Sequence, residues 1–153
     1  MDNVVAYTIW GVEQGSHVLL IESTKLTPVI QQKLKAVLSK EQLFNVHFEN
    51  NFDFYFSKGT FHVATVLNHF MKSLEPYIES EVSVRIWGHA EWESQKELDR
   101  EMEKYEHGAD QILSLNKLTA VCSYNADLIS ESLRRSLINC HGFFMTDDEI
   151  TKI

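Results

Sequence analysis

The stretch His17-Val-Leu-Leu-Ile-Glu22 decides the fold class of this chain. Its apolar residues are continuous rather than alternating, a pattern typical of a strand that is buried on both faces. Thr27-Pro28 then begins a helical pattern that runs to about Leu38, with proline in the first turn, where its missing N–H is not needed. A buried strand followed by an amphipathic helix predicts a unit of a parallel α/β sheet.

Strands and helices continue to alternate on both sides of this unit. The spacing of apolar residues predicts further helices over 4–12, 60–77, 93–113 and from Asp127 or Ser130 to Cys140, with Thr60 as an N-cap. It predicts further strands over 43–48, 81–87, 118–124 (again buried) and 143–145, the last as an edge strand. Residues 52–56 (FDFYF) alternate and predict a short strand or an extended loop.

This order predicts an α/β three-layer sandwich with a mainly parallel central sheet and helices on both faces. We expect a single domain over residues 1–146 and a frayed polar tail over 147–153. An exposed edge strand on such a sheet invites pairing, so a homodimer is an expected assembly.

Composition excludes several classes of protein. The 153 residues carry 14 Lys and Arg against 22 Asp and Glu, a net charge of −8, and the longest basic run is Arg134-Arg135. We therefore expect no binding to nucleic acid or to an anionic membrane. No apolar run approaches the ~20 residues of a membrane span, and an acid stands where a signal peptide carries positive charge, so we expect a cytoplasmic protein.

Familiar cofactor and metal motifs are missing. The chain has no G-x-x-x-x-G-K-[ST], no G-x-G-x-x-G and no G-x-S-x-G, and we expect no cofactor. Its seven histidines show no metal-binding spacing on one element, so we expect no metal site. Cys122 and Cys140 have no CxxC-like spacing and are interpreted as buried reduced thiols.

The segment 85–92 is the most informative for function. It leaves a predicted strand, and ligands of open α/β sheets bind at the carboxyl ends of strands. Its aromatic and polar side chains could form an aromatic box with polar tips, although a packed strand end would have the same sequence. The candidate ligand-binding residues here are Arg85, Gly88, His89, Glu91 and Trp92.

Further candidates follow the other predicted elements. Tyr105 and Glu106 lie on the long helix, where Tyr105 also fits plain core packing. Tyr124 and Asn125 end a predicted strand at the same edge as Glu91, and His141 ends the last helix. We expect these polar groups to converge with those of 85–92 on one rim of the sheet.

The order of these motifs resembles the MEDS domain, a methanogen/methylotroph sensory domain. The resemblance rests on the Arg85-to-Trp92 strand end, Tyr105-Glu106, Cys122-Ser123-Tyr124-Asn125 and the helix ending in His141, together with FYFSKGTFHVATVLNHF and EQGSHVLLIES, and it covers roughly residues 4–145. It implies a fold similar to RecA/KaiC ATPases without the phosphate-binding loop, and a role in sensing small molecules, with hydrocarbon derivatives as a candidate class. Two departures are His89, where the family has Glu, and Gly142, where it has Pro.

These observations favour a non-catalytic sensory or regulatory domain that binds a small ligand, a partner protein or both. The sequence shows no helix-turn-helix or kinase module, so we expect a histidine kinase or a transcription regulator as the protein partner. One alternative is a regulator without a pocket that acts through its acidic helix 93–107. A second alternative is a hydrolase that uses His89, Glu91 and Glu106 for acid–base chemistry.

Overall fold

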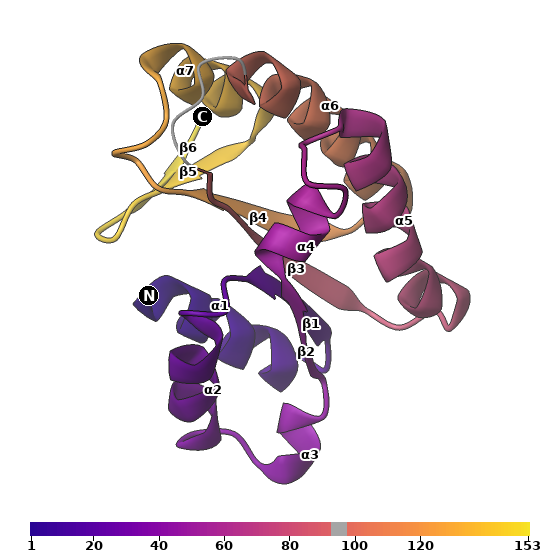
Figure 1. Ribbon diagram of the computed structural model, residues 1–153. Coiled ribbons are helices and arrows are strands. Elements are labelled where there is room, and N and C mark those ends of the chain that lie inside the picture. The colour runs from indigo at the N-terminus through magenta and orange to yellow at the C-terminus, as the bar shows by residue number, and fades with distance from the viewer. Residues whose placement is uncertain (93–97) are drawn as a thin grey trace.

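The computed structural model describes residues 1–92 and 98–153 and arranges them in three layers (Figure 1). The middle layer is a four-stranded parallel sheet with the strand order β2-β1-β3-β4. Its strands are β1 (His17–Glu22), β2 (Val46–Asn50), β3 (Val84–Ala90) and β4 (Thr119–Tyr124). The predicted fold class, an α/β sandwich with helices on both faces of a parallel sheet, is confirmed.

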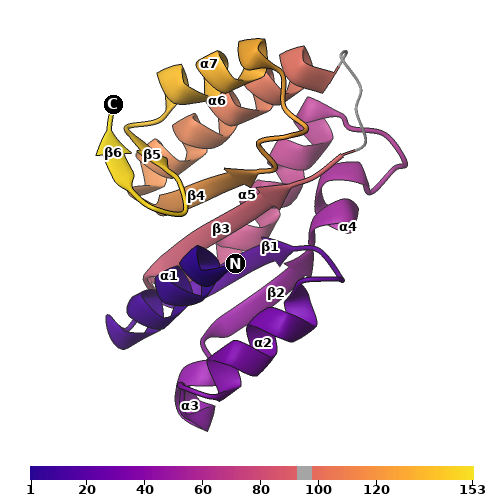
Figure 2. The same cartoon turned by 90° about the vertical axis from the view of Figure 1, so that its left-hand side faces the viewer.

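Helices cover the two faces of the sheet unequally. α1 (Asp2–Glu13) and α2 (Thr27–Lys35) pack on one face, and α5 (Val63–Glu79), α6 (Leu98–Asn116) and α7 (Glu131–Cys140) pack on the other (Figure 2). Two short helices, α3 (Lys40–Leu43) and α4 (Asn51–Phe56), flank β2. In the described part of the chain, no helix combines the length and the apolar character needed to cross a bilayer.

The central strand β1 explains why its sequence is apolar throughout. Val18 and Leu20 point into the core formed with α1 and α2, whereas Leu19 and Ile21 point into the core formed with α4–α7. All four side chains are buried. Each contributes on the order of 1.5–3 kcal/mol by leaving water, so β1 ties the two cores together.

The segment FDFYF is a helix, and the expectation of a strand or loop there was wrong. Asn50 caps the helix α4, because its side-chain oxygen accepts a hydrogen bond of 2.9 Å from the backbone N–H of Asp53. Phe54 and Tyr55 are buried, and the Phe54 ring packs edge-on against Phe70 of α5. The aromatic spacing fits a helix as well as a strand, and the cap decides between them.

Three smaller expectations also differ from the structure. The N-cap of α5 is His62 rather than Thr60. β4 is a half-exposed edge strand, because it pairs with β3 alone, rather than a buried strand. The tail is not frayed, since β6 (Ile150–Lys152) pairs antiparallel with β5 (Phe143–Met145), and this hairpin is separate from the main sheet.

The long helix is confirmed over most of its predicted length. α6 begins at Leu98, and the predicted start at 93–97 lies outside the described residues. Gly108 lies within α6 and does not interrupt it. A Cβ at Gly108 would come 2.5 Å from Cδ1 of Leu67, so the glycine lets α5 and α6 approach closely.

Candidate functional site

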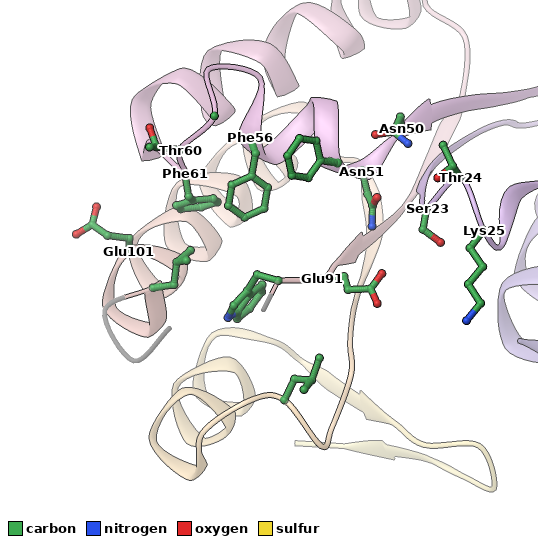
Figure 3. Close-up of a pocket in the computed structure, with 15 residues that line it drawn as sticks. Ser23, Thr24, Lys25, Asn50, Asn51, Phe56, Thr60, Phe61, Glu91 and Glu101 are labelled. Carbon is green, nitrogen blue, oxygen red and sulfur yellow. The ribbon is translucent and has the colours of Figure 1, made fainter. Parts of the chain in front are cut away.

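A cavity of about 1010 Å³ opens beyond the carboxyl ends of β1, β2 and β3 (Figure 3). We call it the carboxyl-edge cavity, and it occupies the edge at which open α/β sheets bind ligands. It is lined by the end of β2 and by the segments that follow β1 to β4, through the residues Ser23, Thr24, Lys25, Asn50, Asn51, Phe52, Phe56, Gly59, Thr60, Phe61, Glu91, Trp92, Leu98, Glu101 and Leu128. The sequence analysis placed Glu91 and Trp92 at this edge, and both line the cavity.

The carboxyl-edge cavity has a polar end and an aromatic end (Figure 3). Lys25 and Glu91 lie at the polar end, and neither forms an ion pair with another residue in the described ranges. Phe56 and Phe61, with ring centroids 6.0 Å apart, mark the aromatic end. Thr60 and Glu101 also lie at this end, where Glu101 is paired with Lys104 (Figure 3). Such a cavity can hold a molecule that is apolar over most of its surface and polar at one end.

An ion pair between buried Glu22 and partly buried His89 lies next to residues of the polar end. His89 Nδ1 lies 2.5 Å from Oε1 of Glu22, and the same oxygen accepts a 2.7 Å hydrogen bond from the backbone N–H of Ser23. Asn51 donates to the carbonyl of His89 at 3.1 Å. Burial alone would lower the pKa of His89, but its hydrogen bond to Glu22 and the charges of Glu22 and Glu91 outweigh burial and raise the pKa.

Gly88 and Tyr105 have packing roles in this part of the structure. A Cβ at Gly88 would lie 3.0 Å from the hydroxyl oxygen of Tyr55, so the glycine makes room for that ring. Tyr105 is buried, with its ring 5.7 Å from Tyr55 and 6.0 Å from Phe61. Burial raises the pKa of Tyr105 well above its usual value. Both residues thus support the aromatic end of the cavity without lining it.

Arg85 lies away from the carboxyl edge, contrary to the expectation of one shared rim. It is at the amino end of β3, where it pairs in register with Val18 and Thr119. Its guanidinium carbon lies 4.2 Å from the centre of the Trp10 ring on α1. Arg85 therefore makes a cation–π contact between the sheet and α1.

A second polar cluster lies between β4, α6 and the end of α7. Glu106 is buried, and its Oε1 accepts a hydrogen bond from the Tyr124 hydroxyl. Its Oε2 lies 3.2 Å from Cys122 Sγ and 3.6 Å from His141 Nε2. Burial raises the pKa of Glu106, although the hydrogen bond from Tyr124, the charge of His141 and the hydrogen bond from Cys122 oppose the rise. Burial also raises the pKa of Cys122 well above its usual value.

The predicted site residues thus fall into separate places. Glu91 and Trp92 line the carboxyl-edge cavity with His89 behind them, while Glu106, Tyr124 and His141 form the second cluster. Asn125 follows β4 and accepts a 3.0 Å hydrogen bond from the backbone N–H of Asp127. The cavity and the second cluster are adjacent at Trp92 and Tyr124, whose ring centroids lie 5.9 Å apart.

Sequence reasoning missed several residues of these two places. Lys25 and Asn51 line the cavity, and each follows the carboxyl end of a strand, so the argument that found Glu91 applied to them as well. Phe56 was hidden by the wrong assignment of FDFYF. Phe61 was placed inside the predicted helix 60–77, whereas α5 begins only at Val63. Cys122 shares a face of β4 with Tyr124 by the two-residue period of a strand, but nothing in the sequence pairs it with Glu106.

Comparison with known proteins identifies the family of this chain. The family model described as MEDS, the MEthanogen/methylotroph, DcmR Sensory domain, matches residues 1–142. Comparisons with curated proteins and with solved structures gave no match. Because the family model spans nearly the whole chain, the resemblance noted in the sequence is confirmed. The chain belongs to the MEDS family of sensory domains.

Proposed function

We propose that this sensory domain binds a small amphipathic molecule in the carboxyl-edge cavity and catalyses no reaction. The observation that carries the proposal is the division of this cavity into a polar end with Lys25 and Glu91 and an aromatic end with Phe56 and Phe61. The rings would bury the apolar part of the ligand, and the charged groups would orient its polar group. Membership in a sensory family supports this reading.

The positions of the acid–base candidates favour binding over hydrolysis. Glu91 lines the carboxyl-edge cavity, whereas Glu106 lines a different cavity beside β4. The imidazole of His89 is held by Glu22. A hydrolase that uses these groups together would need all of them within reach of one substrate.

The acidic helix is a less favourable interaction surface than its sequence suggests. Asp99 accepts a hydrogen bond from Ser130, and Glu101 pairs with Lys104 at 2.5 Å. These intramolecular partners reduce the negative field that a basic partner would meet. Charge reversal at Glu103, which lies on α6 but does not line the carboxyl-edge cavity, should weaken partner binding if the helix is the interface, and it should leave ligand affinity unchanged if the cavity is the sensor.

A sensor must also pass its signal on. A ligand can do so only if it binds one state of the domain more tightly than another. We propose that the output is a contact with a histidine kinase or a transcription regulator, or a change in homodimer formation through the edge strands. Sedimentation of the chain with and without a bound ligand would test the homodimer.

The ligand proposal is tested by thermal unfolding with a panel of short-chain alcohols, aldehydes, amines and carboxylic acids. A ligand at about 100 times its Kd should raise Tm by about 5–10 °C. Lys25→Ala and Glu91→Gln should reduce the shift by weakening binding, while the matched controls Lys58→Ala and Glu75→Gln should keep it. A panel without any shift, or equal shifts in all four variants, would contradict the proposal.

A further inference from the structure

We infer that Glu106, Cys122 and His141 form a binding site for a divalent transition-metal ion of the Zn²⁺ type. The three residues come from α6, β4 and the position after α7, and each directs one donor atom to a common point. The donor atoms are Glu106 Oε2, Cys122 Sγ and His141 Nε2, and all lie within 4.8 Å of one another.

The spacing of the donor atoms suits a tetrahedral ion. Zn²⁺ bonds of about 2.0–2.3 Å at tetrahedral angles place neighbouring ligand atoms about 3.3–3.6 Å apart. Glu106 Oε2 lies 3.2 Å from Cys122 Sγ and 3.6 Å from His141 Nε2. These two distances need to change by only a few tenths of an ångström when an ion enters. The distance between Nε2 and Sγ is within 4.8 Å, so this is the distance that an ion would shorten most.

The surrounding hydrogen bonds already orient the donor atoms. His141 Nδ1 lies 2.7 Å from the carbonyl oxygen of Leu137, which can only accept, so Nδ1 carries a proton. In the neutral imidazole, Nε2 then presents its lone pair toward Glu106. Tyr124 donates to Glu106 Oε1, so Oε2 accepts only from the Cys122 thiol, which would lose its proton to a bound ion. Outer partners of this kind, a carbonyl on the far nitrogen and a donor on the second carboxylate oxygen, are what metal-binding His and Glu residues have in proteins.

An open side gives access to this cluster. A cavity of about 220 Å³ is lined by the three donor residues and by Asp110 and Ser114. It has room for a water molecule as the fourth ligand, and the carboxylate of Asp110, one turn along α6 from Glu106, lies at the same opening. The carboxyl-edge cavity shares none of these lining residues, so this inference does not depend on the proposed ligand site.

The chemistry of the donors selects the class of metal. A thiolate and an imidazole favour Zn²⁺, Co²⁺ and similar ions over Mg²⁺ and Ca²⁺, which prefer oxygen ligands alone. When the metal–sulfur bond forms, the Cys122 thiol releases its proton to solvent, so affinity rises with pH. The bound ion would join α6, β4 and the end of α7 at one point.

The test uses the full chain after dialysis against a chelator, with Co²⁺ and Zn²⁺ as the probes. Co²⁺ should give the near-ultraviolet charge-transfer band of a Co²⁺–thiolate bond and the intense visible bands of a tetrahedral site, and Zn²⁺ should displace it. Cys122→Ser should abolish the charge-transfer band, while Cys140→Ser should keep it. His141→Gln should weaken Zn²⁺ binding by more than the about 10- to 100-fold that outer-shell changes cause, and Tyr124→Phe should weaken it within that range.

Two further variants keep the test clear. Glu91→Gln in the carboxyl-edge cavity should leave Zn²⁺ affinity unchanged, which separates this site from the proposed ligand site. His107→Gln, an exposed histidine on α6, controls for binding to surface imidazoles. Circular dichroism identifies any variant that fails to fold. Because Cys122→Ser and His141→Gln each remove one proposed ligand, either variant tests the site if the other does not fold. Absence of a charge-transfer band in the folded wild-type chain, or equal Zn²⁺ affinity in Cys122→Ser and Cys140→Ser, would overturn the inference.

Discussion

Two buried glutamates in this protein each face a histidine, on opposite sides of the same sheet. Glu22 and His89 lie on the side of α1 and α2, in direct contact at 2.5 Å. Glu106 and His141 lie on the side of α6 and α7, 3.6 Å apart, with a thiol beside them. Both glutamate side chains are 3% exposed, so the two pairs differ in geometry and neighbours rather than in depth.

The comparison shows how the second nitrogen of the imidazole changes what a Glu–His pair can do. In His89 the nitrogen that meets the carboxylate is Nδ1, and a proton between the two groups holds them together. In His141 Nδ1 is committed to the Leu137 carbonyl, and Nε2 faces the carboxylate across a wider gap. The first arrangement stabilises a charge, and the second leaves space for an ion. The experiments below, ordered by expected effect, separate the two pairs.

The largest effect is expected from removing the carboxylate of the second pair. Glu106→Ala should lower the free energy of unfolding by about 2–4 kcal/mol, because it leaves a cavity and an unpaired Tyr124 hydroxyl. Urea denaturation in the presence of a chelator measures this without any metal contribution. Glu103→Ala, a partly exposed position on the same helix, is the control and should stay within about 0.5 kcal/mol of wild type.

In the first pair, Glu22→Gln should lower the free energy of unfolding by about 1–3 kcal/mol near pH 6. The amide keeps an oxygen for the backbone N–H of Ser23, but it cannot compensate the charge of the partly buried His89. Urea denaturation of this variant beside Glu49→Gln, whose histidine partner His69 is more exposed, isolates the effect of burial. Equal losses in the two variants would show that burial of the first pair is unimportant.

The first pair should also make stability depend on pH. The pKa of His89 is raised in the folded protein, so its contribution is fully present below the ordinary unfolded value of about 6.5 and is lost as pH rises through the folded value. The difference in unfolding free energy between wild type and His89→Gln should therefore shrink as the pH rises above about 6.5. A difference that grew with pH would mean that the neutral imidazole is the stabilised form.

The smallest effect is expected at the hydroxyl that supports the second pair. Tyr124→Phe should lower the free energy of unfolding by about 1 kcal/mol in chelator, because only one hydrogen bond to Glu106 is lost. Tyr77→Phe, which alters a partly exposed ring on α5, should change it by less than about 0.5 kcal/mol. If the two variants unfolded alike, the Tyr124–Glu106 hydrogen bond would contribute nothing to folding.

The elements of the fold were more predictable from the sequence than the assembly of the site. The apolar run of β1 required burial on both faces, and the alternation of strands and helices then determined the layers. The prediction for FDFYF was wrong because its aromatic spacing fits both a strand and a helix. The side chain of Asn50 caps the helix and favours the helical conformation. Local capping is therefore the information that periodicity alone overlooked.

Site residues were predictable from the sequence only where they directly follow the carboxyl end of a strand. Glu91 and Trp92 follow β3 and line the cavity. Arg85 precedes Glu91 by six residues, and at about 3.3 Å per residue of strand this places the two residues ~20 Å apart. Glu106, Cys122 and His141 come together only through packing of α6 and α7 against β4. Their separations in sequence match no motif, so only the folded structure reveals the cluster.

The three tryptophans of this chain lie in three different environments, and this has a practical consequence. Trp92 borders the carboxyl-edge cavity, Trp87 is buried against the α1 and α2 core, and Trp10 is half exposed beneath the Arg85 guanidinium. Variants that keep one indole and replace the other two would report by fluorescence on one layer at a time. Emission from Trp92 would follow cavity occupancy, while emission from Trp87 would follow loosening of the opposite layer.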